Sequence, residues 1–230
     1  MRSTRTLAGV ALAGTVALGA AACGSSSTGT SSSSSASSSA AAAPSSASAS
    51  ASPTPAAEIA SLKGVDTAVQ VDAKTLAALT SLKVMVTPTG KAKATTTYKP
   101  ATFDFPITGG NVKVFAKGEV DPYVQGIIHH DGSGLMFAAG GKTLTVENFD
   151  VDPGTSMLMA SAKGSSGAKI PLFFLDGSGL QITKDAAGHA KLDGTKVELT
   201  AESAAALNKT FSVTAFQPRM LIGIAHITAG

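Results

Sequence analysis

The feature that most constrains the fold is the repeated interruption of short apolar runs by turn-forming residues after about residue 58. Short runs rich in apolar residues recur there, each only long enough for one strand, and Gly, Asp and Pro separate them. Short strands of this kind favour an antiparallel sandwich or barrel. We therefore predict a mainly β domain over residues 58–230. The expected strands are 82–86, 112–115, 126–130, 135–138, 143–149, 156–162, 170–175, 180–183, 195–199, 211–216 and 221–227.

Three connectors between these runs are rich in glycine. They are Gly140-Gly141, the Asp-Gly-Ser-Gly segment at 131–134, and a second Asp-Gly-Ser-Gly segment at 176–179. Glycine tolerates the positive φ that tight hairpin turns require. The sequence therefore predicts a turn at each of the three places.

Two segments depart from the strand pattern and resemble each other. Residues 67–79 align without gaps on residues 195–207, and each reads as an alternating strand, an N-cap residue and an Ala/Leu-rich helix. The caps are Asp72 and Thr200, residue types whose side chains accept hydrogen bonds from a helix N-terminus. We predict two short helices, each covering an opening of the β domain; chance similarity between Ala-rich stretches is the alternative.

Residues 24–55 are almost wholly Ser, Ala, Thr, Gly and Pro. Such a tract has no large apolar side chains to bury, so it cannot offset the entropy lost on ordering. We predict that residues 23–57 form a disordered linker.

The N-terminal segment has a basic start, an apolar run over about residues 7–19, three alanines and then Cys23, the chain's one cysteine. This order resembles a bacterial lipoprotein signal, which implies that 1–22 is a signal peptide and that Cys23 carries acyl chains such as palmitate at the cell membrane. The apolar run is too short for a spanning helix, which needs about 20 residues. An ordinary secretory signal cut at an A-x-A site, leaving Cys23 as a free thiol, is the alternative.

Charge and motifs exclude several function classes. Removal of residues 1–22 takes away two arginines, so the formal charge falls from +3 to +1, and no Lys/Arg cluster indicates nucleic acid. The sequence contains no nucleophile elbow, P-loop, dinucleotide fingerprint or H-E-x-x-H motif. We predict no catalytic residues, no metal site and no enzymatic activity.

His129 and His130 are the first candidates for a ligand site. They end an apolar run, and successive strand residues face opposite sides, so only one imidazole can point into a pocket. Neutral imidazole is a good ligand for a metal or for haem iron. The alternative is a polar strand end, with one histidine packed and the other in water.

Six short motifs follow one another along the folded part, at residues 103–110, 126–135, 148–154, 171–176, 199–208 and 222–225. Their order resembles the haem-transport-associated (HtaA-type) domains of actinobacterial surface proteins. The resemblance spans residues 65–227 and implies a β-rich surface domain that binds haem through a tyrosine assisted by a histidine. The family's histidine segment corresponds to His129 or His130. Its tyrosine belongs to a segment corresponding to residues 65–80, which contains no tyrosine, so Tyr98 and Tyr123 are the remaining candidates.

These observations favour a cell-envelope lipoprotein with a non-enzymatic binding domain, whose ligand is haem, another apolar molecule or a cell-wall component. The alternative is a structural or adhesive envelope protein with no small-molecule site. Ligand binding predicts an apolar pocket that reaches a histidine or tyrosine, whereas the structural alternative predicts a filled core.

Overall fold

The computed structural model describes residues 52–165 and 168–230. The predictions for Cys23, for the signal peptide 1–22 and for the linker up to residue 51 lie outside these residues. The described elements are β1(Ala57–Ile59), β2(Val65–Val71), α1(Ala73–Ser81), β3(Met85–Gly90), β4(Lys93–Thr95), β5(Thr102–Pro106), β6(Gly109–Val114), β7(Val124–Ala139), β8(Lys142–Asp152), β9(Met157–Ala162), β10(Ile170–Asp176), the short 3-10 helix η1(Gly177–Gly179), β11(Gln181–Lys184), β12(Ala190–Leu199), α2(Ala201–Phe211) and β13(Leu221–Ala229).

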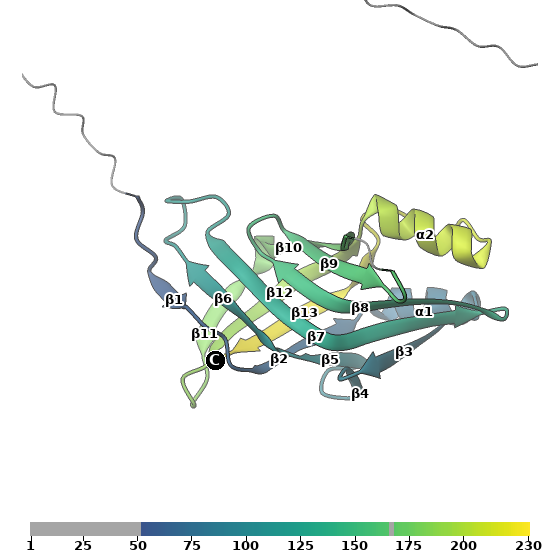
Figure 1. The fold of residues 1–230 in the computed structure, drawn as a ribbon, viewed down its shortest axis with the longest axis horizontal. Coiled ribbons are helices and arrows are strands. Elements are labelled where there is room, and N and C mark those ends of the chain that lie inside the picture. The colour runs from purple at the N-terminus through teal and green to yellow at the C-terminus, as the bar shows by residue number, and fades with distance from the viewer. Residues whose placement is uncertain (1–51, 166–167) are drawn as a thin grey trace, which may run out of the picture. The chain divides into compact units, whose positions relative to one another are not determined.

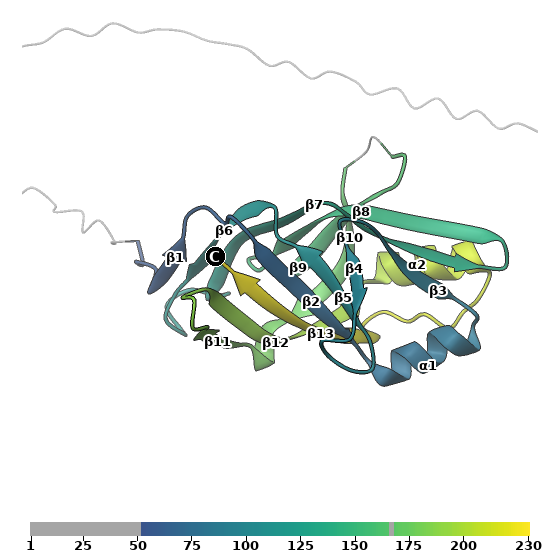
Figure 2. The ribbon, with the colours of Figure 1, turned by 90° about the horizontal axis from the view of Figure 1, so that it is seen from below.

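The strands form one antiparallel sheet that curls on itself (Figures 1 and 2). Its order is β1-β6-β7-β8-β9-β10-β12-β13-β2-β5-β4, with β11 added on β12 and β3 on β7. The first half of β7 pairs with β6 and its second half with β3, which leads straight into β4 at the other edge of the sheet. The predicted mainly β fold is therefore confirmed, in its barrel-like form.

The local turn signals are confirmed at two of the three glycine-rich connectors. Gly140 and Gly141 have φ values of 56° and 75° and join β7 to β8 in a tight hairpin, as a two-residue turn with two positive φ angles requires. Residues 177–179 form the turn of η1, where Asp176 accepts a hydrogen bond from the backbone N–H of Ser178.

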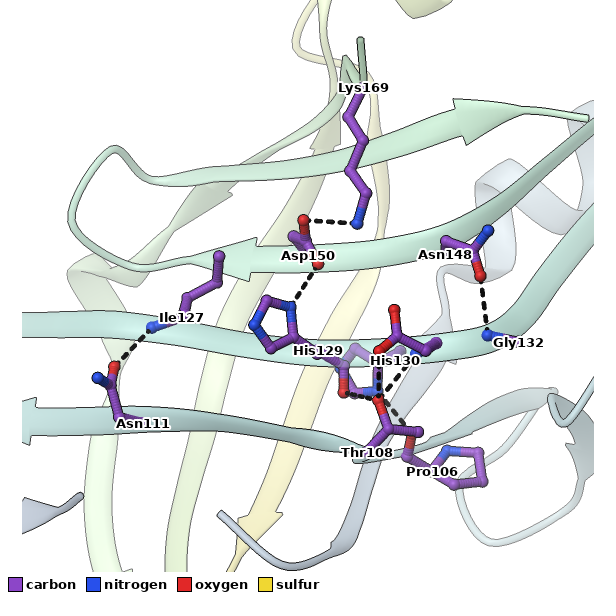
Figure 3. A network of polar contacts seen from close by, with 11 residues as sticks. Pro106, Thr108, Asn111, Ile127, His129, His130, Gly132, Asn148, Asp150 and Lys169 are labelled. Atoms are coloured by element: carbon purple, nitrogen blue, oxygen red, sulfur yellow. Dashed lines mark hydrogen bonds and ion pairs between the residues drawn. The ribbon is translucent and has the colours of Figure 1, made fainter. Parts of the chain in front are cut away.

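The turn predicted at 131–134 is wrong, because β7 runs through it as one strand with a β-bulge. Side chains from the β5–β6 connection and from β8 satisfy the backbone there: Asp131 N–H donates to Thr108 Oγ1 and Gly132 N–H to Asn148 Oδ1 (Figure 3). Bulges of this kind bend a strand and strengthen its twist. The bulge lets β7 pair with β8 along both halves of its length.

Both predicted helix caps are confirmed. Asp72 accepts hydrogen bonds from the first-turn N–H groups of α1, and Thr200 accepts one from Ser203 N–H in α2. The helices do not cover separate openings, however: both views show them at the same end of the curled sheet, beside the tip of the β7–β8 hairpin (Figures 1 and 2). Lys142 in that hairpin donates to the hydroxyl of Ser212, which caps the C-terminus of α2.

The strand predicted over 211–216 is wrong. Phe211 ends α2, and the segment after it is a loop. The Asn208 side chain holds the loop with two hydrogen bonds, donating to Phe216 O and accepting from Phe216 N–H. The two strand–helix segments are therefore similar only as far as their helices, since the strand that follows α2 is β13.

The core lies inside the curl of the sheet. Alternate residues of β13 are buried, as expected when one face of a strand meets a core. Phe105 and Phe149 meet edge to face, with ring centroids 5.4 Å apart. Ile128, Val146 and Leu199 are almost fully buried nearby.

Candidate ligand-binding cavity

A cavity of about 110 Å³ lies in the interior beneath α1 and α2, and we call it the helix-end cavity. Nine of the described strands contribute to its wall together with both helices, namely β2, β3, β5, β7, β8, β9, β10, β12 and β13. An apolar cavity of about 150 Å³ stays dry and admits benzene, so this one can hold an apolar group of similar scale. Its lining includes Val69, Leu79, Phe105, His130, Phe137, Leu144, Phe149, Ala206, Leu207 and Ile222.

The polar side chains in this lining already have partners. The Thr75 hydroxyl donates to Leu221 O, and the Ser203 hydroxyl donates to Leu172 O at 2.7 Å. The remaining pair, Thr67 and His130, bond to each other. Because these polar groups are used within the protein, the cavity offers a ligand an apolar surface.

His130 is 1% exposed and forms part of the cavity wall. Its Nδ1 lies 3.0 Å from Pro106 O and its Nε2 lies 3.2 Å from Thr67 Oγ1. Since a carbonyl can only accept, Nδ1 carries the proton and Nε2 accepts from the Thr67 hydroxyl. Burial, the largest influence, lowers the pKa of His130 to about 4, so the ring is neutral at physiological pH. Thr67 lies in the segment to which the HtaA-type resemblance assigns the family's tyrosine.

His129 faces the opposite side of β7, as the alternation of strand residues requires (Figure 3). Its Nδ1 lies 2.7 Å from Asp150 Oδ1, and its side chain is 35% exposed. Asp150 also pairs with Lys169. Burial raises the pKa of Asp150, but hydrogen bonds from Lys169 and His129 outweigh it and hold that pKa below its ordinary value.

Tyr98 lies on the outer face, in the loop between β4 and β5, where its backbone bonds to the Thr102 hydroxyl. The Tyr98 ring stacks on His226 with centroids 4.0 Å apart and an interplanar angle of 11°. His226 Nδ1 lies 3.0 Å from Asp193 Oδ1, and its buried Nε2 has no hydrogen-bond partner among the described residues. Sequence reasoning missed this cluster because its members come from distant strands, and no local motif marks them.

Tyr123 lines a second cavity of about 300 Å³, which we call the Tyr123-end cavity. Lys117 Nζ lies 5.3 Å from the centroid of its ring. The four candidate residues predicted from the sequence therefore fall in four places. His130 lines the helix-end cavity, Tyr123 lines the Tyr123-end cavity, and His129 and Tyr98 line neither.

Within residues 52–165 and 168–230, no group of three or more His, Cys, Asp or Glu side chains could hold a metal ion. No helix in the same residues is both long enough and apolar enough to cross a membrane.

Comparison with known proteins yields similar solved structures but no family. No family model matches the chain, and no curated protein matches it. The C-terminal domain of HtaA from Corynebacterium glutamicum is similar with a TM-score of 0.47 and 14% identity, over 74% of this chain and 97% of that one. The heme binding protein HtaB from the same organism is similar with a TM-score of 0.33 and 10% identity, over 75% of this chain and 95% of that one. An HtaA domain is thus among the similar structures, as the motif order indicated, and at these identities the likeness concerns the fold alone.

Proposed function

We propose that this chain is a non-enzymatic binding protein that takes an apolar ligand into the helix-end cavity. The observation that supports this is an unfilled apolar volume in the interior that reaches the buried His130. At roughly 24 cal/mol per Å³, leaving 110 Å³ empty costs about 3 kcal/mol. A ligand that fills the cavity offsets this loss of stability on binding. A purely structural or adhesive domain gains nothing from an empty cavity.

We also propose that the domain is presented at the cell envelope on an acylated Cys23 and the Ser/Ala-rich linker. As a random coil, a linker of this length reaches on the order of 30 Å. Labelling of cells with radioactive palmitate tests the anchor: the label should enter the native chain and be lost in Cys23→Ser. A native chain that stays unlabelled and is released into the medium favours the ordinary secretory signal.

Haem does not fit the helix-end cavity in the conformation that this structure shows. Neither nitrogen of His130 is free to bind iron, because both are hydrogen-bonded. The cavity is also smaller than the roughly 300 Å³ at which pockets for drug-sized ligands begin. We therefore assign this cavity to a smaller apolar group, such as part of an acyl chain.

Haem capture is the second candidate function, and an observation on the outer face favours it. His226 bonds to Asp193 through Nδ1, and its Nε2 has no partner among the described residues. Histidines that bind a metal commonly have this arrangement, in which one ring nitrogen bonds to a carboxylate and the other binds the metal. Tyr98 covers this imidazole and would have to swing aside for iron to reach Nε2.

Fluorescence of N-phenylnaphthylamine, a dye that brightens in apolar sites, tests the first proposal. We expect saturable binding to the chain without its signal peptide. Ala206→Phe should abolish binding, because Ala206 lines the cavity from α2. The matched control is Ala205→Phe on the exposed side of the same helix, which should bind normally. Failure of the native chain to bind the dye, or equal binding by Ala206→Phe, would leave the structural or adhesive alternative.

A haem titration followed by Soret absorption tests the second candidate. A shifted, saturable band should weaken in His226→Ala and persist in His130→Gln. Weakening in His130→Gln alone would instead place haem in the interior. A spectrum that matches free haem throughout would exclude haem binding.

A further inference from the structure

The two cavities lie at opposite ends of the same interior. In β7, Val124 and Ile128 line the Tyr123-end cavity, whereas His130 and Phe137 line the helix-end cavity. A strand advances about 3.3 Å per residue, so this order places the cavities one after the other along the strand. Both cavities therefore lie within the curl of the sheet, one after the other along β7.

Val151 in β8 connects the two cavities. It is 4% exposed and, among the described residues, is the one side chain that lines both. Ile128 stands beside it on one side and Phe149 on the other, facing different cavities. The boundary between the cavities is thus no thicker than a side chain at this point.

The cavities differ in the polar groups that they present. Thr195 and Tyr123 line the Tyr123-end cavity, and neither hydroxyl makes a hydrogen bond to a described residue, although Thr195 is only 8% exposed. The polar side chains of the helix-end cavity, in contrast, are hydrogen-bonded within the protein. Hydroxyls left without partners in a largely apolar cavity are the kind of group that orients a bound ligand.

Two residues of opposite charge lie beside the Tyr123-end cavity. Lys117 lies over the Tyr123 ring, and Asp121 is among the lining residues. Opposite charges beside one cavity do not select a ligand by its net charge. The recognition available here is hydrogen bonding by hydroxyls, which favours an uncharged polar head.

We propose that the interior binds a single-chain uncharged amphipath, with its hydrogen-bonding head in the Tyr123-end cavity and its acyl tail passing Val151 into the helix-end cavity. This deepens the proposed function and rests on it. The ligand class is an acyl chain esterified to a small polyol, for which monopalmitoylglycerol is the probe.

Displacement of N-phenylnaphthylamine by monopalmitoylglycerol tests the proposal in the chain without its signal peptide. Tyr123→Phe and Thr195→Val each remove one hydroxyl and should weaken monopalmitoylglycerol binding by about two- to tenfold. Thr228→Val, which removes a half-buried hydroxyl that lines neither cavity, should bind as the native chain does. Methyl palmitate lacks the head hydroxyls, and the three substitutions should leave its affinity unchanged.

The connection at Val151 has its own test. Val151→Phe should weaken the binding of monopalmitoylglycerol more than that of monocapryloylglycerol, because only the longer tail must pass the boundary between the cavities. Val151→Ala should strengthen the binding of monopalmitoylglycerol relative to that of monocapryloylglycerol. Melting curves establish that each variant is folded. Equal affinities of the native chain for monopalmitoylglycerol and methyl palmitate, or dye binding without displacement, would overturn the proposal and leave the proposed function standing. Absence of dye binding would remove both.

Discussion

Replacement of His130 by Gln should remove much of the loss of stability that we expect this domain to undergo in mild acid. His130 is buried, and its imidazole is neutral in the fold because burial lowers its pKa from 6.5 to about 4. In the unfolded chain the imidazole regains an ordinary pKa and binds a proton more readily. Between these two pKa values the unfolded state therefore holds more protons than the folded state, so stability falls as the pH falls.

The size of the effect follows from the two pKa values. Their difference corresponds to about 3 kcal/mol when it is fully expressed, below pH 4. The stability that depends on the neutral imidazole of His130 is fully present above pH 6.5 and is lost progressively as the pH falls toward 4. Between about pH 7 and pH 5, linkage gives a loss of about 2 kcal/mol in the free energy of unfolding.

Urea denaturation of the native chain and of His130→Gln at both pH values measures this loss. Gln itself changes the stability at both pH values, so the informative quantity is the difference between the two proteins in their pH dependence. Asp66, whose pKa is raised by burial and by Asp104, titrates in both proteins and cancels. Equal losses in the two proteins would refute the argument that His130 is held neutral by burial.

Three further substitutions and one matched control test the packing and the helix capping of the fold, each by urea denaturation. Gly223→Ala places a Cβ 2.1 Å from Gln70 O and should cost about 1–3 kcal/mol, whereas Gly109→Ala, whose Cβ meets nothing within 4 Å, should cost less than half as much. Asp72→Ala removes the N-cap of α1 and should cost about 1 kcal/mol; an unchanged midpoint would contradict the cap. Ile128→Ala, at a fully buried position, should cost about 2–5 kcal/mol, and a smaller loss would mean that the neighbouring side chains collapse into the space.

Features with local causes were predictable from the sequence. Gly140 and Gly141 form a hairpin because both residues accept positive φ, which depends on the two residues alone. Asp72 and Thr200 begin helices because their side chains bond to N–H groups two or three residues ahead. The recurrence of short apolar runs likewise predicted the β class, since the period and length of a run are properties of the chain itself.

The partners of the candidate site residues were not predictable, because they come from distant parts of the chain. The segment 131–134 has the composition of a turn, yet Thr108 and Asn148 bond to its backbone and keep it in a strand. Its composition cannot indicate those contacts, since a turn and a bulge both suit glycine. The sequence alone likewise does not place both helices at the same end.

The same distinction holds for the histidines. Strand alternation predicted that His129 and His130 face opposite sides, and they do. Which of them faces the interior, and that Thr67 and Pro106 occupy both of its nitrogens, depends on strands β2 and β5 lying against β7. The sequence determined the β class, the helix caps and the alternation of faces through short-range physics. The tertiary structure decided which side chains share a cavity, because only packing brings residues far apart in the chain within hydrogen-bonding distance.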